Sequence, residues 1–476
     1  MEPFIHLHVH TQYSLLDGQA SIDALINKAY DDGMRAIAVT DHGNMFGIKE
    51  FFNKVNKKNG KVQGTIKDLQ KELKTLSAKE ERTDEENARL AEIPGLLEKA
   101  KGDLFKPIIG CECYCARNHR LQKTEKEDRS GWHLIVLAKN MTGYKNLIKI
   151  VSQSWTEGFY GRPRIDKELL EQHREGLIVC SACLGGEIPQ KIMHGNIHAA
   201  EEAVLWFKQM FGDDYYLEMQ RHETHRADAD QTVYKHQVEV NKVLVELAHK
   251  HGIKVIATND VHFVNEEDAD AHDRLICLST GKDLDDPNRM RYTKQEWMKT
   301  TAEMNQIFSD IPDALRNTLE IADKVEFYSI DSGPIMPTFN IPEEFGTEEE
   351  YRKKLTEKDL FDEFTRDENG NVVLSQEDAE AKIKKLGGYD KLYRIKLEAD
   401  YLAKLTYEGA KPRYGDPLSD EVKERLNFEL HIMKTMGFPG YFLIVQDFIR
   451  AAREELGVSV GPGRGSAAGS AGGFFF

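Results

Sequence analysis

The sequence predicts an α/β protein that begins with a parallel sheet or barrel and continues into more helical segments. Residues 1–53 have the pattern strand, helix, strand, which starts a βαβ unit. From residue 106 to about residue 281, short apolar strands alternate with amphipathic helices. Two charged segments, residues 56–105 and 346–419, depart from this pattern and are expected to be helical inserts.

The opening unit follows from three short patterns. Apolar and polar residues alternate over residues 4–10, as in a half-buried strand, and residues 22–30 have helical spacing. Residues 36–40 are a short apolar run typical of a buried strand, and Asp41-His42-Gly43 ends it.

Residues 56–105 are expected to form an inserted helical hairpin. An apolar stripe recurs at helical spacing on both sides of a capping box at residues 83–86, with Ile66, Leu69, Leu73 and Leu76 before it and Leu90, Ile93 and Leu97 after it. Because charge runs usually face water, a solvated spacer with a narrow apolar seam is favoured over a binding device.

Further strands are expected at residues 108–113, 134–137, 177–181, 215–219 and 255–257. Residues 297–325 are expected to be mostly helical with a break at Pro312, and Pro334, Pro337 and Pro342 mark a linker. Later helices are expected to start at residues 347–350 and 375–378, and Val422, Leu426, Leu430 and Met433 share one helix face. The predicted divisions are therefore residues 1–281, 282–345, 346–419 and 420–476. The chain stops at Phe474-Phe475-Phe476 just after a glycine-rich loop, so we expect an abrupt truncation.

The composition excludes several classes of protein. The 476 residues carry a formal net charge of −16, which argues against a surface that coats nucleic acid but leaves room for a local basic groove. Hydrophobic residues at 40% suffice for ordinary cores and exclude a wholly disordered chain. With no long apolar run and no leader pattern, we expect no membrane association and a cytoplasmic location. The six cysteines are expected to be reduced.

The strongest indication of function is the series His6, His8 and His10. Positions i, i+2 and i+4 of a strand share one face, so these imidazoles are expected to project together. Zinc, manganese and iron favour imidazole and carboxylate ligands. The series therefore predicts a metal site rather than isolated core histidines.

Further ligand-type residues recur beside other short apolar strands: Asp41, His42, Glu112, His133, Cys183, Asp260 and His262. In parallel α/β domains and barrels, chemistry takes place at the carboxyl ends of the strands. We therefore expect these residues to meet in one site. Several cations held there would neutralise a phosphate, activate a water and hold the attacking and leaving oxygens in line, which predicts hydrolysis of a phosphoester.

The motifs LHVHTQYSLLDG, AVTDHGN, KPIIGCECY, HLIVLAKN and NDVHF resemble those of the PHP domain, the polymerase and histidinol phosphatase family. The resemblance implies a distorted (β/α)7 barrel with two or three zinc or manganese ions. It implies as ligands His8, His10, Asp17, His42, Glu112, His133, Cys183, Asp260 and His262. We expect Glu112, as a bridging carboxylate, and Asp260 to be catalytic. His6 falls outside the motif and is expected to pack behind it, while Cys111, Cys113 and Cys115 are expected to form a core layer.

Residues 428–449 and 457–470 resemble the beginning of the palm in the alpha subunits of bacterial replicative DNA polymerase III, a family whose members carry an N-terminal PHP domain. The resemblance implies an N-terminal fragment of a DNA-directed DNA polymerase, with an α+β nucleotidyltransferase-type palm whose helical start is residues 282–345. The implied partners are a DNA primer-template, deoxynucleoside triphosphates, the sliding clamp and other replisome subunits, including a proofreading exonuclease.

The glycine-rich loop suits the triphosphate of a nucleotide, because glycine backbone amides can approach an anion closely. The residues expected to bind it are Gly461, Gly463, Arg464, Gly465 and Ser466. A dinucleotide-binding loop is excluded, since Ser466 stands in place of the third glycine. In the polymerase family the palm aspartates that hold magnesium follow this loop. These 476 residues are therefore not expected to polymerise DNA.

Three functions remain open from the sequence. The metal site could trim DNA 3′ ends as an exonuclease, or it could hydrolyse a small monoester such as histidinol phosphate, although the palm-like residues argue against the second. The barrel could instead be a structural and partner-docking module in which the metals serve stability.

Overall fold

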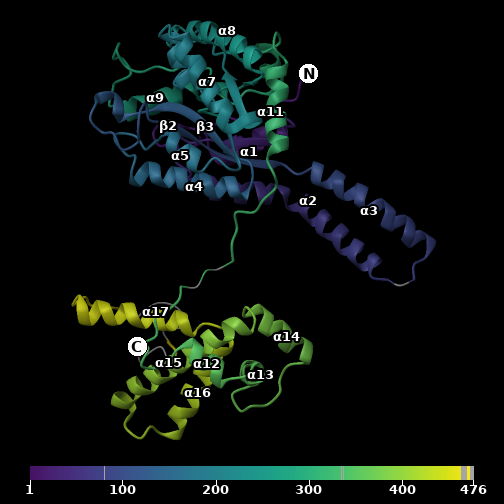
Figure 1. Cartoon of the computed structure of the whole chain (residues 1–476), viewed down its shortest axis with the longest axis vertical. Coiled ribbons are helices and arrows are strands. Elements are labelled where there is room, and N and C mark those ends of the chain that lie inside the picture. The colour runs from purple at the N-terminus through teal and green to yellow at the C-terminus, as the bar shows by residue number, and fades with distance from the viewer. Residues whose placement is uncertain (80, 334, 336, 462–468, 472–476) are drawn as a thin grey trace. The chain divides into compact units, whose positions relative to one another are not determined.

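The structure is a computed structural model that describes residues 1–79, 81–333, 335, 337–461 and 469–471. The chain divides into two compact units, Met1–Asp331 and Ser332–Phe476, whose elements are labelled in Figure 1. Among the described residues, no helix has the length and apolar character needed to cross a membrane.

The first unit is built on a seven-stranded sheet with the order β1-β2-β3-β5-β6-β7, in which β4 also pairs with β2. The strands are β1 (Ala36–Val39), β2 (Lys106–Cys115), β3 (Trp132–Ala138), β4 (Arg164–Ile165), β5 (Leu177–Cys180), β6 (Tyr215–Met219) and β7 (Lys254–Ala257). This confirms the α/β class and every strand expected after residue 106, while β4 is an additional strand that the sequence does not predict.

The sheet is mixed, because β3 runs antiparallel to both β2 and β5. A parallel return needs a connection long enough for a crossover helix. Residues 116–131 contain only the 3-10 turn η1 (Lys126–Arg129), so β3 folds straight back along β2. The parallel order expected from the opening βαβ unit is therefore interrupted at this one strand.

Residues 4–10 form no regular strand, although they lie where the sequence places one. The amides of Ala38 and Thr40 donate to the carbonyls of His6 and Val9, at 2.9 and 2.8 Å. On the other side, Val9 bridges Val261, just beyond β7. This segment thus connects the first and last strands of the sheet and curls it into a barrel.

Helices cover the outside of this sheet (Figure 1). They are α1 (Ile22–Asp31), α4 (Met141–Thr156), α5 (Lys167–Gln172), α6 (Glu187–Met193), α7 (Ile197–Phe211), α8 (Val233–His251) and α9 (Ala269–Thr280), with short turns η2 (Gly212–Asp214) and η3 (Glu266–Asp268). The core between helices and sheet contains Cys111, Cys113 and Cys115, which confirms the predicted core layer.

Residues 282–331 pack with the barrel, so the division of the structure at Asp331 does not coincide with the boundary predicted at residue 281. This stretch includes α10 (Thr301–Ile307) and α11 (Asp313–Lys324), which confirms the expected helices and the break at Pro312. Met304, Phe308 and Leu315 are buried in the barrel's main core. The apolar faces of these helices explain why the first unit extends beyond α9.

The predicted hairpin is formed by α2 (Ile48–Ser77) and α3 (Asp84–Gly102), which project from the barrel in Figure 1. The Thr83–Glu86 capping box begins α3 as expected. A separate small core of Leu69, Leu76, Ile93 and Leu97 holds the two helices together.

The described part of the second unit is helical. Its helices are α12 (Glu348–Lys354), α13 (Glu357–Thr365), α14 (Gln376–Lys385), α15 (Tyr389–Tyr414), α16 (Asp420–Thr435) and α17 (Pro439–Arg450), followed by the π turn η4 (Ala451–Glu455). Thr347 and Ser375 cap α12 and α14, which confirms both predicted helix starts. Residues 457–461, which precede the glycine-rich loop, form no strand.

Candidate metal centre

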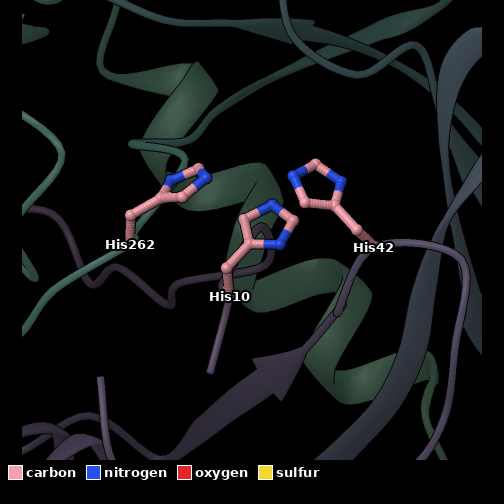
Figure 2. A group of neighbouring side chains, drawn as sticks. All are labelled: His10, His42 and His262. Atoms are coloured by element: carbon pink, nitrogen blue, oxygen red, sulfur yellow. The ribbon is translucent and has the colours of Figure 1, made fainter. Parts of the chain in front are cut away.

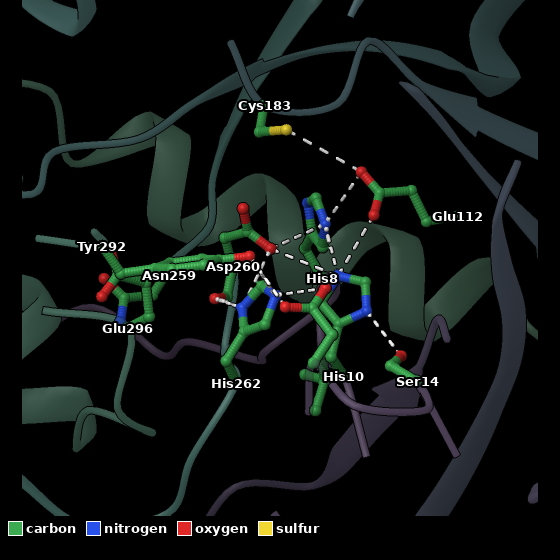
Figure 3. A network of polar contacts seen from close by, with 12 residues as sticks. His8, His10, Ser14, Glu112, Cys183, Asn259, Asp260, His262, Tyr292 and Glu296 are labelled. Atoms are coloured by element: carbon green, nitrogen blue, oxygen red, sulfur yellow. Dashed lines mark hydrogen bonds and ion pairs between the residues drawn. The ribbon is translucent and has the colours of Figure 1, made fainter. Parts of the chain in front are cut away.

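The nine side chains predicted as ligands lie together at one end of the barrel, and most of them are drawn in Figure 3. His42, Cys183 and Asp260 each follow the end of a strand, at β1, β5 and β7. His133 lies instead near the beginning of β3. Because β3 is antiparallel to its neighbours, its first residues reach the same end of the barrel.

Three histidine rings form the centre of the cluster, as Figure 2 shows. The ring centroid of His10 lies 4.1 Å from that of His42 and 4.4 Å from that of His262. These residues come from three separate segments, so the barrel and not the local sequence brings them together.

Glu112 connects the two sides of the cluster. Its Oε2 lies 2.8 Å from His42 Nδ1 and 3.2 Å from His10 Nε2. Its Oε1 lies 2.8 Å from His133 Nδ1. A single carboxylate that faces imidazoles with both oxygens has the geometry of a bridge between two cations.

Asp260 and Asp17 complete the acidic part. Asp260 Oδ1 lies 3.0 Å from His8 Nε2 and 3.3 Å from His10 Nε2. Asp17 Oδ2 lies 2.8 Å from His42 Nε2.

Cys183 lies at the edge of the cluster, on the side of Glu112 (Figure 3). Its Sγ is 3.5 Å from His133 Nδ1 and 3.8 Å from Glu112 Oε1. The thiol therefore lies close enough to His133 and Glu112 to share a cation with them. Burial raises the pKa of the Cys183 thiol well above its ordinary value, so without a cation it stays protonated.

The backbone is strained at three of the turns that present these ligands. Leu16, Ala182 and Asp260 have φ values of 59°, 63° and 47°, in the left-handed region that favours glycine. Leu16 and Ala182 directly precede the predicted ligands Asp17 and Cys183. Such conformations cost about 1–3 kcal/mol each and persist where surrounding structure enforces them, commonly at functional sites.

The charges of the cluster keep its carboxylates ionised. Although burial opposes it, neighbouring carboxylates raise the pKa values of His8 and His42 well above their ordinary value, so these imidazoles lose a proton when a cation binds. Burial alone would raise the pKa of Glu112, but the imidazoles of His133, His42 and His8 outweigh it and hold that pKa well below its ordinary value. Burial would also raise the pKa of Asp260, but the imidazole of His8 outweighs it and holds that pKa well below its ordinary value. Burial, assisted by His42 and His262, lowers the pKa of His10. Ionised carboxylates and a neutral imidazole are the forms that coordinate a metal.

Several residues that the sequence did not single out support the ligands. Glu218 Oε1 lies 2.6 Å from His8 Nδ1 and accepts a hydrogen bond from Thr258 Oγ1 at 2.6 Å. Ser14 Oγ lies 2.9 Å from His10 Nδ1. The Tyr292 hydroxyl donates to Asp17 Oδ1 at 3.0 Å. Such partners fix the tautomer and orientation of a ligating side chain.

Two of the histidine and aspartate candidates lie outside the cluster. His6 is buried with its Nε2 2.8 Å from the Lys299 carbonyl oxygen, so it packs behind the site as expected. The Asp41 carboxylate accepts hydrogen bonds from the Thr11 and Ser14 hydroxyls at 2.9 and 2.8 Å and thereby holds the turn that follows His10.

The cluster fits divalent cations. A metal–ligand distance of about 2.0–2.2 Å places two ligands of one ion roughly 3–3.5 Å apart, and His8, His10, Glu112 and Asp260 approach one another at 3.0 to 3.4 Å. Among the described residues, three atoms of the cluster are buried without a well-formed hydrogen bond: His42 Nδ1, Glu112 Oε2 and Asp260 Oδ1. A buried polar atom of this kind is costly unless an ion or water satisfies it.

The site opens into a cleft of about 250 Å³ that Asp17, His42 and Tyr292 line. A substrate can therefore reach the cluster from solvent on this side. Of the predicted triphosphate-binding residues, Gly461 is exposed, while Gly463, Arg464, Gly465 and Ser466 lie outside the described residues.

Comparisons with known proteins match both parts of the chain. Residues 6–222 match the family model of the PHP domain, and residues 400–475 match that of the bacterial DNA polymerase III alpha NTPase domain. The first match contains seven of the nine predicted ligands and ends before Asp260 and His262.

Curated relatives match nearly the whole chain. A DNA polymerase III subunit alpha of Borreliella burgdorferi is 38% identical over 98% of this chain and 32% of that protein. The subunits of Treponema pallidum and Thermus aquaticus are each 35% identical over 98% of this chain, and over 31% and 35% of their own lengths. The chain thus spans about a third of the length of these relatives.

Proposed function

Since this chain carries a PHP domain and is a relative of the bacterial DNA polymerase III alpha subunits along nearly its whole length, we propose that it is part of a replicative DNA polymerase whose metal centre hydrolyses phosphodiesters at DNA 3′ ends. The observation that carries the proposal is the convergence of five histidines and three carboxylates at the floor of an open cleft.

The proposed ligands are the nine predicted residues, with Glu112 and Asp260 closest to the reaction. Cations bound there would supply charge neutralisation and Lewis acidity toward a phosphoester. Glu112 would hold two cation sites at a fixed separation, because its two oxygens face different histidines. Glu218, Ser14 and Tyr292 would keep His8, His10 and Asp17 in place. Two or three zinc or manganese ions suit this mixture of imidazole and carboxylate.

The wider role is proposed from the relatives, which are named as DNA polymerase subunits. It comprises a primer-template, deoxynucleoside triphosphates with magnesium, the sliding clamp and other replisome subunits in the cytoplasm. In that setting a frayed primer end is a natural substrate for a hydrolytic site on the same polypeptide.

The test is nucleotide release from a 3′-labelled single strand, measured with manganese or zinc for the wild type, Glu112→Gln and Asp260→Asn. We expect release by the wild type alone. Equal release by all three proteins would identify a contaminant. A fully metallated wild type that releases nothing would instead favour the structural and docking module, and release of phosphate from histidinol phosphate but not from DNA would favour a small-molecule phosphatase.

A further inference from the structure

Three aromatic rings lie at the rim of the cleft that leads to the metal centre. They are Phe46, Trp155 and Phe159, with exposed fractions of 58%, 43% and 45%. The rings of Trp155 and Phe159 are stacked, with centroids 5.4 Å apart and an interplanar angle of 15°, and Phe46 lies 6.3 Å from Trp155. A cluster of exposed rings at the mouth of a cleft is typical of a surface that meets a ligand or a partner.

The rings are tied to the metal centre and not merely near it. The Trp155 indole N–H donates to the Gly43 carbonyl at 2.8 Å, and Gly43 directly follows His42. Phe46 lies in the same loop, between His42 and the start of α2. A group that stacks on these rings would therefore be within the same cleft as the proposed ligands.

A cation stands at the same rim. Arg162 is exposed and has no ion-pair partner among the described side chains, and its guanidinium lies 5.6 Å from the centroid of the Tyr114 ring. Tyr114 in turn stacks on His42 at 5.9 Å. A positive charge between exposed rings and a phosphoesterase site complements a ligand that carries both bases and phosphates.

We propose that Phe46, Trp155 and Phe159 form a stacking platform for the terminal bases of a single-stranded nucleic acid, with Arg162 as the partner of a backbone phosphate. This inference rests on the proposed hydrolysis and names how its substrate is held. Aromatic faces accept any base, so the platform would bind single strands with little sequence preference, whereas a paired end would have to fray first.

The test is the affinity for a fluorescein-labelled oligothymidylate with 3′ phosphorothioate linkages, measured by fluorescence anisotropy in the presence of manganese. Phe159→Leu keeps an apolar side chain but removes the ring face, and we expect it to weaken binding on the order of tenfold. Phe159→Tyr should keep wild-type affinity. Phe327→Leu is the matched control, because Phe327 is 51% exposed but does not line the cleft. Metal content is measured for every variant.

A second probe has the same sequence with an abasic 3′ terminus. The wild type should bind this probe more weakly than the first probe. Phe159→Leu should bind both probes with the same affinity, because the ring and the terminal base form one contact that either change removes. Arg162→Gln should lower the affinity for both probes and reduce the dependence of binding on salt concentration.

The outcomes separate this inference from the proposed hydrolysis. Unchanged affinity in Phe159→Leu overturns the platform, and if that variant also alters self-association, the rings are a protein interface. Ring-dependent binding without nucleotide release would contradict the hydrolysis but support the platform. Nucleotide release that is equal in the wild type and Phe159→Leu would support the hydrolysis and overturn the platform.

Discussion

The Nε2 atoms of His8 and His10 lie 3.1 Å apart, and each ring has its Nδ1 beside another acceptor, Glu218 for His8 and Ser14 for His10. Protons held on the Nδ1 atoms leave both Nε2 lone pairs directed at the same point. A cation between them would satisfy both lone pairs. The pair therefore adds to the preference of the centre for metal, and Glu218 contributes to it by holding the His8 ring.

Replacing the central carboxylate should empty more than one cation site. Glu112→Gln is expected to lose metal that survives dialysis in the wild type, since both of its oxygens face histidines. Cys183→Ser should retain part of the metal, because the thiol lies at the edge of the cluster. Elemental analysis measures both. Glu187→Gln is the matched control, since Glu187 is equally buried but contacts Lys167 and Lys191. Full metal content in Glu112→Gln would refute the bridging role.

The carboxylate behind His8 should matter although it is outside the predicted ligand set. Glu218→Gln removes the acceptor that orients the imidazole, and we expect metal affinity to fall about 10- to 100-fold. A competition titration with a chromogenic chelator measures this. Ser14→Ala, which removes the neutral partner of His10, should have a smaller effect because a hydroxyl is a weaker acceptor. If Glu218→Gln binds metal as tightly as the wild type, His8 is not held by this contact.

The hairpin should open independently of the barrel. Ile93 is fully buried in the small core between α2 and α3. Ile93→Ala should destabilise that core by roughly 2–4 kcal/mol through the cavity it leaves. Hydrogen exchange should then speed up in α2 beyond residue 60 and in α3, while metal content and exchange in β2 stay at wild-type values. Faster exchange throughout the barrel would show that hairpin and barrel unfold together.

One buried lysine should make stability depend on pH. Burial lowers the pKa of Lys299 to about 7, although the Trp297 ring 3.5 Å from its Nζ favours the charged form. The unfolded value is higher, so between pH 7 and 10 the unfolded chain binds more protons and this residue makes stability rise with pH. Lys299→Met should therefore be more stable than the wild type at pH 7, by a margin that shrinks toward pH 10. Denaturant titrations across that range measure the difference, and a constant difference would contradict the assignment.

The strands could be predicted because they are buried on both faces and form continuous apolar runs, as in residues 134–137 and 177–180. The direction of β3 could not be predicted, since the direction depends on the connection that precedes the strand and not on the residues of the strand itself. β4 has two residues, too few for any periodicity.

The candidate site divides in the same way. His8 and His10 are two positions apart, so the sequence alone shows that they lie close together. Glu218 has a recognisable pattern in the sequence, because it is an acid inside the buried strand Tyr215–Met219, just as Glu112 is inside β2. Tyr292 had none: its contact with Asp17 joins residues 275 positions apart in loops without a repeating pattern.

The hairpin has a mechanical side as well. Thirty residues make α2 about 45 Å long, and only its first turns, with Ile48, Phe51 and Val55, are anchored in the barrel core. His42 lies six residues before that anchored end. α2 is thus a long lever arm whose fixed end adjoins the loop that carries His42. A molecule that pulls on the far end of the hairpin would exert its torque at this fixed end.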